Sequence, residues 1–130
     1  MDDTRGRTRS MVSAARKMLR EREAEEVSAR RALLAAARGD FDRTVEFIVQ
    51  KYRPREVWQW GSLLYPDTFT SGSDIDIGLV GVSVTDHMEI QRLTEGTACL
   101  PLHIARLEEM DPRNVAHLKK YGKRVYPDTA

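Results

Sequence analysis

Residues 60–77 read WGSLLYPDTFTSGSDIDI and decide the fold, because they join a tight Gly-Ser turn to a short acidic strand. In an extended chain, side chains two residues apart point to the same face, so Asp74 and Asp76 lie side by side and Ile75 faces the other way. Two neighbouring carboxylates repel each other unless a cation lies between them. Magnesium suits this place, since it is usually held by one or two carboxylates together with substrate phosphates. The strand therefore indicates phosphate chemistry.

The Gly-Ser pair supplies the complementary half of a phosphate site. Gly61 has no Cβ, so the backbone can come close to a phosphate, and exposed amides and the Ser62 hydroxyl can donate hydrogen bonds to it. Neither half is specific alone. A bare Asp-x-Asp is most often a solvated turn or strand end, and a Gly-Ser pair is most often an ordinary loop.

Eleven residues separate Ser62 from Asp74, and the order Gly61-Ser62, loop, Ser73-Asp74-Ile75-Asp76 resembles the nucleotidyltransferase fold of the DNA polymerase β type. Within that group it looks most like the minimal nucleotidyltransferases, which are related to kanamycin nucleotidyltransferase. The resemblance extends over roughly residues 41–126. It implies an α/β (α+β) fold with a small mixed β-sheet and helices on one side, to which this chain adds an N-terminal helical arm.

The bulk composition is that of one small protein domain with an arm. We expect the arm over residues 1–40 and the nucleotidyltransferase domain over 41–130 of the 130 residues. With 21 basic and 20 acidic residues, the net charge of +1 gives no reason to expect direct nucleic-acid binding. The single cysteine, Cys99, excludes an intramolecular disulfide, and no apolar run reaches the ~18 residues of a membrane span. These features predict a cytoplasmic protein without membrane contact.

Residues 9–52 have a helical pattern, with apolar side chains recurring mainly at steps of three and four. Arg38-Gly39-Asp40 allows either one long helix or a C-cap followed by a new N-cap, and we favour a break or kink there. Residues 16–31 are dense in Arg and Glu. They form either a solvated helix with i,i+4 ion pairs or an arm that packs on another chain, including a second copy of this one.

The remaining elements alternate between strands and helices. Asp111-Pro112 is a helix start, with an N-cap followed by Pro at the first position, and Thr85-Asp86 can cap a shorter helix. We expect strands at 56–60, 74–80, 99–107 and 123–126, and helices at 85–93 and 112–121.

The resemblance implies a third carboxylate on the strand after the acidic one, where this chain has His103 within Pro-Leu-His-Ile-Ala. Histidine brings no negative charge at neutral pH, and imidazole suits zinc or copper better than magnesium. His103 is therefore a weak third ligand, a general base for an acceptor hydroxyl, or a histidine that only packs beside the strand. Glu108 and Glu109 lie too far along the chain to replace the missing carboxylate.

Two functions follow from the resemblance and remain open. The first is a metal-dependent nucleotidyltransferase that moves AMP from ATP to a protein or small hydroxyl acceptor. Its catalytic residues would be Asp74, Asp76 and His103, the two aspartates would hold Mg²⁺ or Mn²⁺, and Gly61, Ser62 and Ser73 would bind the nucleotide. The second is a nucleotide-binding or purely protein-binding antitoxin, weakened by His103. In both cases the family resemblance implies a toxin–antitoxin pair with an all-helical HEPN-type partner.

Overall fold

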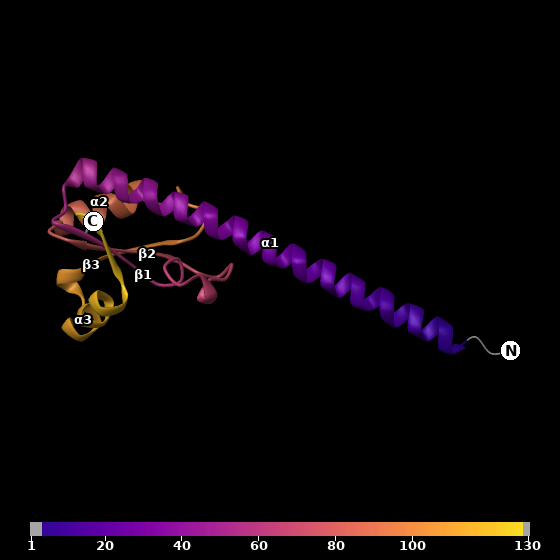
Figure 1. Cartoon of the computed structure of the whole chain (residues 1–130). Helices are drawn as coiled ribbons and strands as arrows, with labels where there is room; N and C mark the ends of the chain where they lie inside the picture. The colour runs from indigo at the N-terminus through magenta and orange to yellow at the C-terminus, as the bar shows by residue number, and fades with distance from the viewer. Residues whose placement is uncertain (1–3, 129–130) are drawn as a thin grey trace. The chain divides into compact units, whose positions relative to one another are not determined.

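The structure is a computed structural model that describes residues 4–128. Its main elements are α1 (Thr4–Tyr52), β1 (Glu56–Trp60), β2 (Ile75–Val80), α2 (Val84–Thr94), β3 (Leu102–Arg106), α3 (Pro112–Tyr121) and β4 (Lys123–Tyr126), shown in Figure 1. The chain divides into two compact units between Ala32 and Leu33. The expected separate arm at residues 1–40 stays a prediction.

The four strands form one mixed sheet in the order β3-β2-β1-β4. β1 runs antiparallel to both β2 and β4, whereas β2 and β3 are parallel. In this register Trp60 lies opposite Asp76, and Asp76 lies opposite His103. The expected fold class, an α/β protein with a small mixed sheet and a long N-terminal helix, is confirmed.

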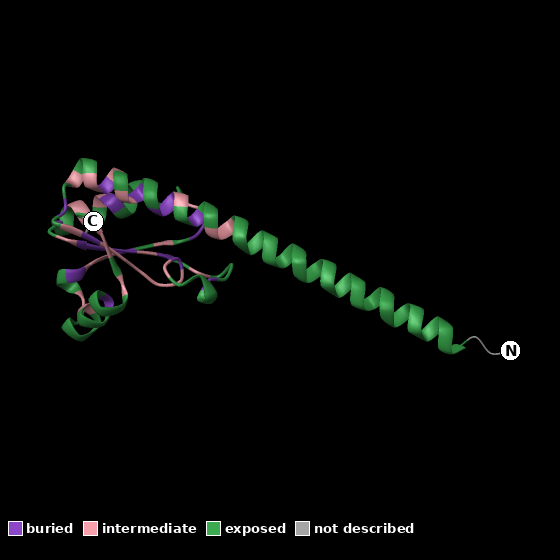
Figure 2. Cartoon of the chain, in the orientation of Figure 1, coloured by how far each residue is buried: buried purple, intermediate pink, exposed green. Residues whose placement is uncertain are grey.

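One face of the sheet packs against α2 and the C-terminal part of α1 (Figures 1 and 2). Helix α1 presents buried residues at steps of three and four, while β2 buries alternate side chains on the same layer. The core consists mainly of Ala37, Phe41, Ile48, Val57, Leu63, Phe69, Ile75, Ile77, Leu79, Val82, Ile90, Leu100 and Ile104. This layer fixes which face of β2 carries the carboxylates.

Helix α3 lies at the opposite face of the sheet, where Lys119 places its ammonium 5.7 Å from the centre of the Trp58 ring. Trp58 and Trp60 alternate with the fully buried Val57, so both tryptophans belong to this second face. The expectation that the helices lie on one side of the sheet therefore holds for α1 and α2 and not for α3. Helix α3 borders the face that carries Asp76.

The expected break at Arg38-Gly39-Asp40 is wrong, because α1 continues through it to Tyr52. The buried Asp40 carboxylate accepts a hydrogen bond from the backbone N–H of Cys99 at 2.8 Å and also pairs with Arg43. It therefore anchors a distant loop instead of capping a new helix. Asp40 has the carboxylate that an N-cap needs, but in the fold this carboxylate makes a tertiary contact.

Two further boundaries differ from the expected ones. The third strand begins at Leu102 and not at Cys99, since the Cys99 N–H is taken by Asp40. The N-cap of α2 is Ser83, whose Oγ accepts from the Asp86 N–H at 3.1 Å, instead of Thr85-Asp86. The helix start at Asp111 is confirmed, with its carboxylate accepting from the Arg113 N–H at 2.8 Å.

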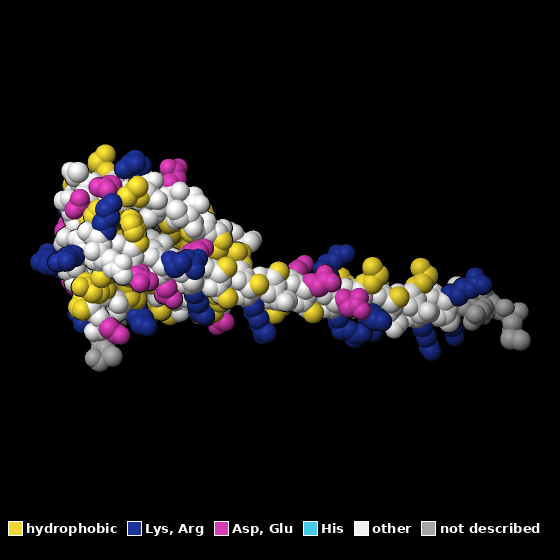
Figure 3. Space-filling model, turned by 90° about the horizontal axis from the view of Figure 1, so that it is seen from above, with side chains coloured by type: hydrophobic (Ala, Val, Ile, Leu, Met, Phe, Trp, Pro, Cys, Tyr) yellow, Lys and Arg dark blue, Asp and Glu magenta, His cyan; other side chains and the backbone are white. Residues whose placement is uncertain are grey.

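The unit that precedes Leu33 is helical from Thr4, and each of its described residues is exposed (Figure 2). Large apolar side chains are among them, including Met11 at 73% and Met18 at 63% exposure. Residues 21–26 hold four glutamates, with basic side chains on both sides of them, as Figure 3 shows. Over residues 4–128, no helix has the length and apolar character needed to cross a membrane.

Candidate active site

The Gly-Ser turn follows directly from β1 and is shaped by Gly61, whose φ is +85°. The Gly61 carbonyl accepts hydrogen bonds from the N–H groups of Leu64 at 3.1 Å and Tyr65 at 3.3 Å. Residues other than glycine rarely adopt this left-handed backbone conformation. The sequence therefore makes a compact turn here and leaves the half-buried Ser62 at its first corner.

Two helices hold this turn in place from outside. On α1, the Arg38 guanidinium donates to the carbonyl of the buried Leu63 at 3.1 Å. On the other side, the Tyr65 hydroxyl donates to the carbonyl of Tyr121, the last residue of α3. The turn is therefore fixed between the core helix and the helix that borders the second face.

The carboxylate of Asp76 lies directly against the bare backbone of Gly61. A Cβ added at Gly61 would lie 2.3 Å from Asp76 Oδ2, which is closer than real atoms approach. The antiparallel register produces this contact, because it places Trp60 opposite Asp76. The predicted phosphate-binding turn and the predicted acidic strand are thus brought together, as their order in the sequence suggested.

Asp76 and Asp74 share an electrostatic environment that disfavours two negative charges. Burial raises the pKa of the Asp76 carboxyl, the hydrogen bond and electrostatic attraction of His103 oppose that rise, and the charge of Asp74 adds to it. Asp74 itself is exposed and lies one residue before β2. A cation between the two carboxylates would relieve this repulsion.

His103 lies beside Asp76 because β2 and β3 are paired in parallel with these two residues opposite each other. Its Nδ1 is 3.1 Å from Asp76 Oδ1, and its ring meets the Trp60 ring edge-on at 5.9 Å. The His103 side chain is 61% exposed, so the imidazole also faces solvent. With a proton on Nδ1, the ring donates to Asp76 and leaves Nε2 free to accept a proton.

The other residues considered for the site have structural partners. Ser73 closes the turn before Asp74, since its Oγ accepts from the Thr70 N–H at 2.9 Å and its own N–H donates to the Thr70 carbonyl. Glu108 accepts from the Gly81 N–H at 2.6 Å, and Glu109 pairs with Arg106 at 2.5 Å. Both glutamates therefore bind groups other than Asp76, and the sequence had already indicated that neither replaces the third carboxylate.

The donor set fits one cation shared with a nucleotide. Among residues 4–128, no three His, Cys, Asp or Glu side chains are grouped closely enough to hold a metal ion by themselves. Magnesium, however, usually takes one or two protein carboxylates and completes its shell with water and phosphate oxygens. Asp74 and Asp76 supply those two carboxylates. A second cation would need a further carboxylate, where the chain has His103.

A hollow of about 420 Å³ adjoins the turn on the side of α3. Its lining combines aromatic, apolar and amide side chains with the backbone of Gly61. The lining residues are Trp60, Gly61, Tyr65, Met110, Asn114, His117, Leu118, Tyr121 and Gly122. Sequence reasoning missed this hollow, since only the docking of α3 against β1 creates it.

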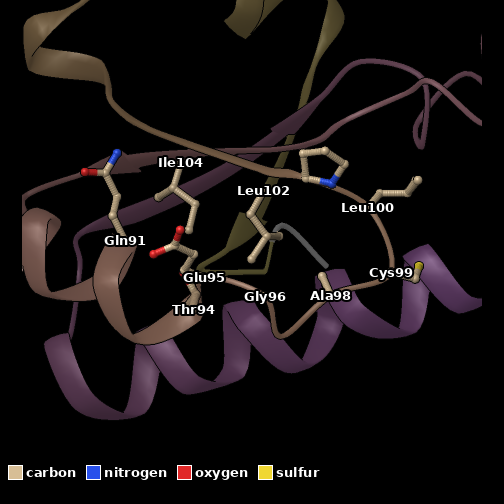
Figure 4. A pocket seen from close by; sticks show the side chains of 10 residues that line it. Gln91, Thr94, Glu95, Gly96, Ala98, Cys99, Leu100, Leu102 and Ile104 are labelled. Carbon is tan, nitrogen blue, oxygen red and sulfur yellow. The ribbon is translucent and has the colours of Figure 1, made fainter.

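A second hollow of about 470 Å³ lies elsewhere, between the end of α2, the following loop and β3 (Figure 4). Leu100, Leu102 and Ile104 make much of its wall, and Cys99 lies at one end. Its described lining contains no pair of neighbouring carboxylates like Asp74 and Asp76. The hollow is larger than the one beside the turn, and its lining mixes apolar side chains with Gln91, Thr94 and the single carboxylate of Glu95.

Comparison with known proteins gives similarity in structure alone. The chain matches no protein-family model, and no curated protein matches it. A chain in the crystal structure of a toxin–antitoxin with AMP-PNP is similar with a TM-score of 0.54 and 13% identity, covering 67% of this chain and 73% of that one. A chain in a mutant of the toxin–antitoxin MntA–HpeT gives 0.55 and 13%, covering 68% and 72%. At this identity the likeness shows the fold.

Proposed function

We propose that this protein is a metal-dependent nucleotidyltransferase that transfers AMP from ATP to a hydroxyl group on a protein or small acceptor. The observation that carries the proposal is the contact between Asp76 and Gly61, with Asp74 beside it. This contact places a repelling pair of carboxylates directly beside the Gly-Ser turn, where a bound cation would link them to a phosphate. Fold similarity adds weight but does not identify the reaction.

In this proposal the residues of the turn bind the phosphates of the nucleotide, and the two aspartates bind its cation. Gly61 and Ser62 would bind the terminal phosphates through the backbone and the hydroxyl, and Ser73 would lie at the edge of the site. Asp74 and Asp76 would hold Mg²⁺ or Mn²⁺. When bound, the cation supplies charge neutralisation on the triphosphate, which is the main requirement of phosphoryl and nucleotidyl transfer.

The transfer itself would follow an in-line displacement. The acceptor oxygen forms a bond to the α-phosphorus, the bond from that phosphorus to the bridging oxygen of the β-phosphate breaks, and pyrophosphate leaves with the electron pair. The hydroxyl proton passes to Nε2 of His103, which Asp76 orients through Nδ1. His103 thus acts as a base in the place where the family resemblance implies a carboxylate ligand.

The partner we propose is a toxin of the all-helical HEPN type, for which this chain would be the antitoxin. The two similar structures named above are toxin–antitoxin structures. Residues 4–32 offer an exposed helix with large apolar side chains such as Met11 and Met18, which is a surface suited to another chain. This observation also favours a second candidate, an antitoxin that acts by contact or self-association without turnover.

Calorimetric titration of ATP with Mg²⁺ or Mn²⁺ into wild type and into Asp74→Asn/Asp76→Asn tests the proposal, followed by a pyrophosphate-release assay with the helical partner present. The matched control is Asp42→Asn/Asp86→Asn, which removes two carboxylates from α1 and α2. Metal-dependent binding that only the first double variant loses, together with pyrophosphate release, supports the enzyme. Binding without release favours the contact antitoxin, and absence of binding refutes the nucleotide site.

A further inference from the structure

We propose that the hollow of about 420 Å³ between the Gly-Ser turn and α3 receives the nucleobase of the bound nucleotide, and that Asn114 reads its edge in favour of adenine. The inference rests on the proposed function, because it needs a nucleotide at Asp74 and Asp76. It goes further by placing the base in this hollow and by naming the residue that selects it.

The hollow adjoins the carboxylate site, because two residues border both. Gly61 lines the hollow and also touches Asp76, so its backbone lies between the two. Trp60 lines the hollow as well, and its ring meets His103 edge-on. A nucleotide with its phosphates at the turn therefore finds this hollow directly beside it.

The lining suits a flat heterocycle. Trp60, Tyr65 and Tyr121 contribute aromatic surface, and Met110 and Leu118 contribute apolar surface. Both tyrosines are exposed in the protein, so a base that enters would cover aromatic area that water now contacts. The volume falls within the range of about 300–1,000 Å³ that small-molecule sites occupy. The Tyr65 hydroxyl donates to the Tyr121 carbonyl, so a hydrogen bond joins two residues of the lining.

Asn114 is the one amide side chain in this described lining, and it lies in the first turn of α3. An amide carries both a donor and an acceptor, which is the pattern needed to pair with the N6 amino group and an adjacent ring nitrogen of adenine. A carboxylate in its place only accepts. It would repel the lone pair of the adenine ring nitrogen and would pair with the N–H groups of guanine.

The experiment measures ATP and GTP affinity with Mg²⁺ for wild type, Asn114→Asp and Gln91→Glu by calorimetry. Gln91→Glu is the matched control, because it makes the same amide-to-acid change on α2, in the lining of the other hollow. We expect Asn114→Asp to lower the ratio of ATP to GTP affinity by about tenfold or more, since a good bidentate pair discriminates by about that factor. The control should leave the ratio unchanged. Tyr121→Ala should weaken both nucleotides alike.

The outcomes separate the two proposals. If wild type binds ATP in a metal-dependent way that Asp74→Asn/Asp76→Asn abolishes, but Asn114→Asp keeps the wild-type ratio, the base pocket is refuted and the proposed function stands. If wild type prefers GTP, the adenine assignment is refuted. If wild type binds no nucleotide, both proposals fail together. Circular dichroism of each variant shows that a change in ratio does not come from unfolding.

Discussion

Replacing Gly61 by alanine tests the contact on which the candidate site depends. Gly61 has a φ of +85°, and its added Cβ would lie 2.3 Å from Asp76 Oδ2. Two effects therefore add at this one position. The backbone must hold an L side chain in the left-handed region, and the Asp76 carboxylate must move away from the turn.

Gly96→Ala separates these two effects, because Gly96 has a similar φ of +73° and nothing within 4 Å of its added Cβ. An L residue in the left-handed region costs about 1–2 kcal/mol, which is the whole expected cost at Gly96. At Gly61 the forced displacement adds an overpacking cost of about 1–3 kcal/mol. The difference between the two variants therefore measures the contact between Gly61 and Asp76.

The assay is urea unfolding of wild type and both variants, with ATP titration in parallel. With a urea slope of about 1–3 kcal/mol per M, a loss of 1 kcal/mol lowers the midpoint by about 0.3–1 M, so the two costs are separable. Gly61→Ala should also weaken metal-dependent ATP binding about tenfold or more, because Asp76 leaves its place, whereas Gly96→Ala should not. Equal destabilisation by the two variants, or unchanged ATP affinity in Gly61→Ala, would refute the reasoning.

Three further predictions concern the charged groups. His103→Asp should slow pyrophosphate release, because it removes the imidazole that accepts the hydroxyl proton, and faster release would refute that role and indicate that a carboxylate there completes a cation site. Because burial raises the pKa of Asp76 above 3.8, the folded protein binds its proton more tightly than the unfolded chain, and ionisation destabilises the fold. Asp76→Asn should thus unfold at higher urea than wild type at about pH 7, a gain that disappears near pH 3; a constant gain would show another cause. Asp40→Ala should cost about 1–3 kcal/mol in urea unfolding, since it leaves the Cys99 N–H without its acceptor, and a neutral result would contradict that contact.

The sequence predicted those parts of the site whose chemistry is local. Period-two alternation from Asp74 to Leu79 identifies β2 and its two faces, and the Gly-Ser pair identifies a turn that needs a positive φ. The structure places them in contact through an antiparallel register. That register requires β1 and β2 to be neighbours, and the residues alone did not predict this strand order.

Prediction from the sequence failed where a side chain binds a residue that is distant along the chain. Asp40 has the chemistry of an N-cap next to a glycine, yet its carboxylate binds the backbone of Cys99, which lies 59 residues further along the chain. The same contact delays the start of β3 to Leu102. The hollow beside Asn114 was also out of reach, because the N-cap at Asp111 fixes where α3 begins but not which face it turns toward β1.

The backbone register fixes the position of residue 103, whereas its side chain determines the charge and proton chemistry beside Asp76. Parallel pairing of β2 and β3 puts residue 103 opposite Asp76 whatever its type, so an exchange of His103 for a carboxylate would change the charge there and leave the backbone position unchanged. In the proposed function, nucleotide binding would use the two aspartates and the turn, whereas transfer would also need a group that accepts the hydroxyl proton. Binding and transfer would then be separable, because a change at residue 103 of β3 would affect transfer and leave the two aspartates and the turn in place.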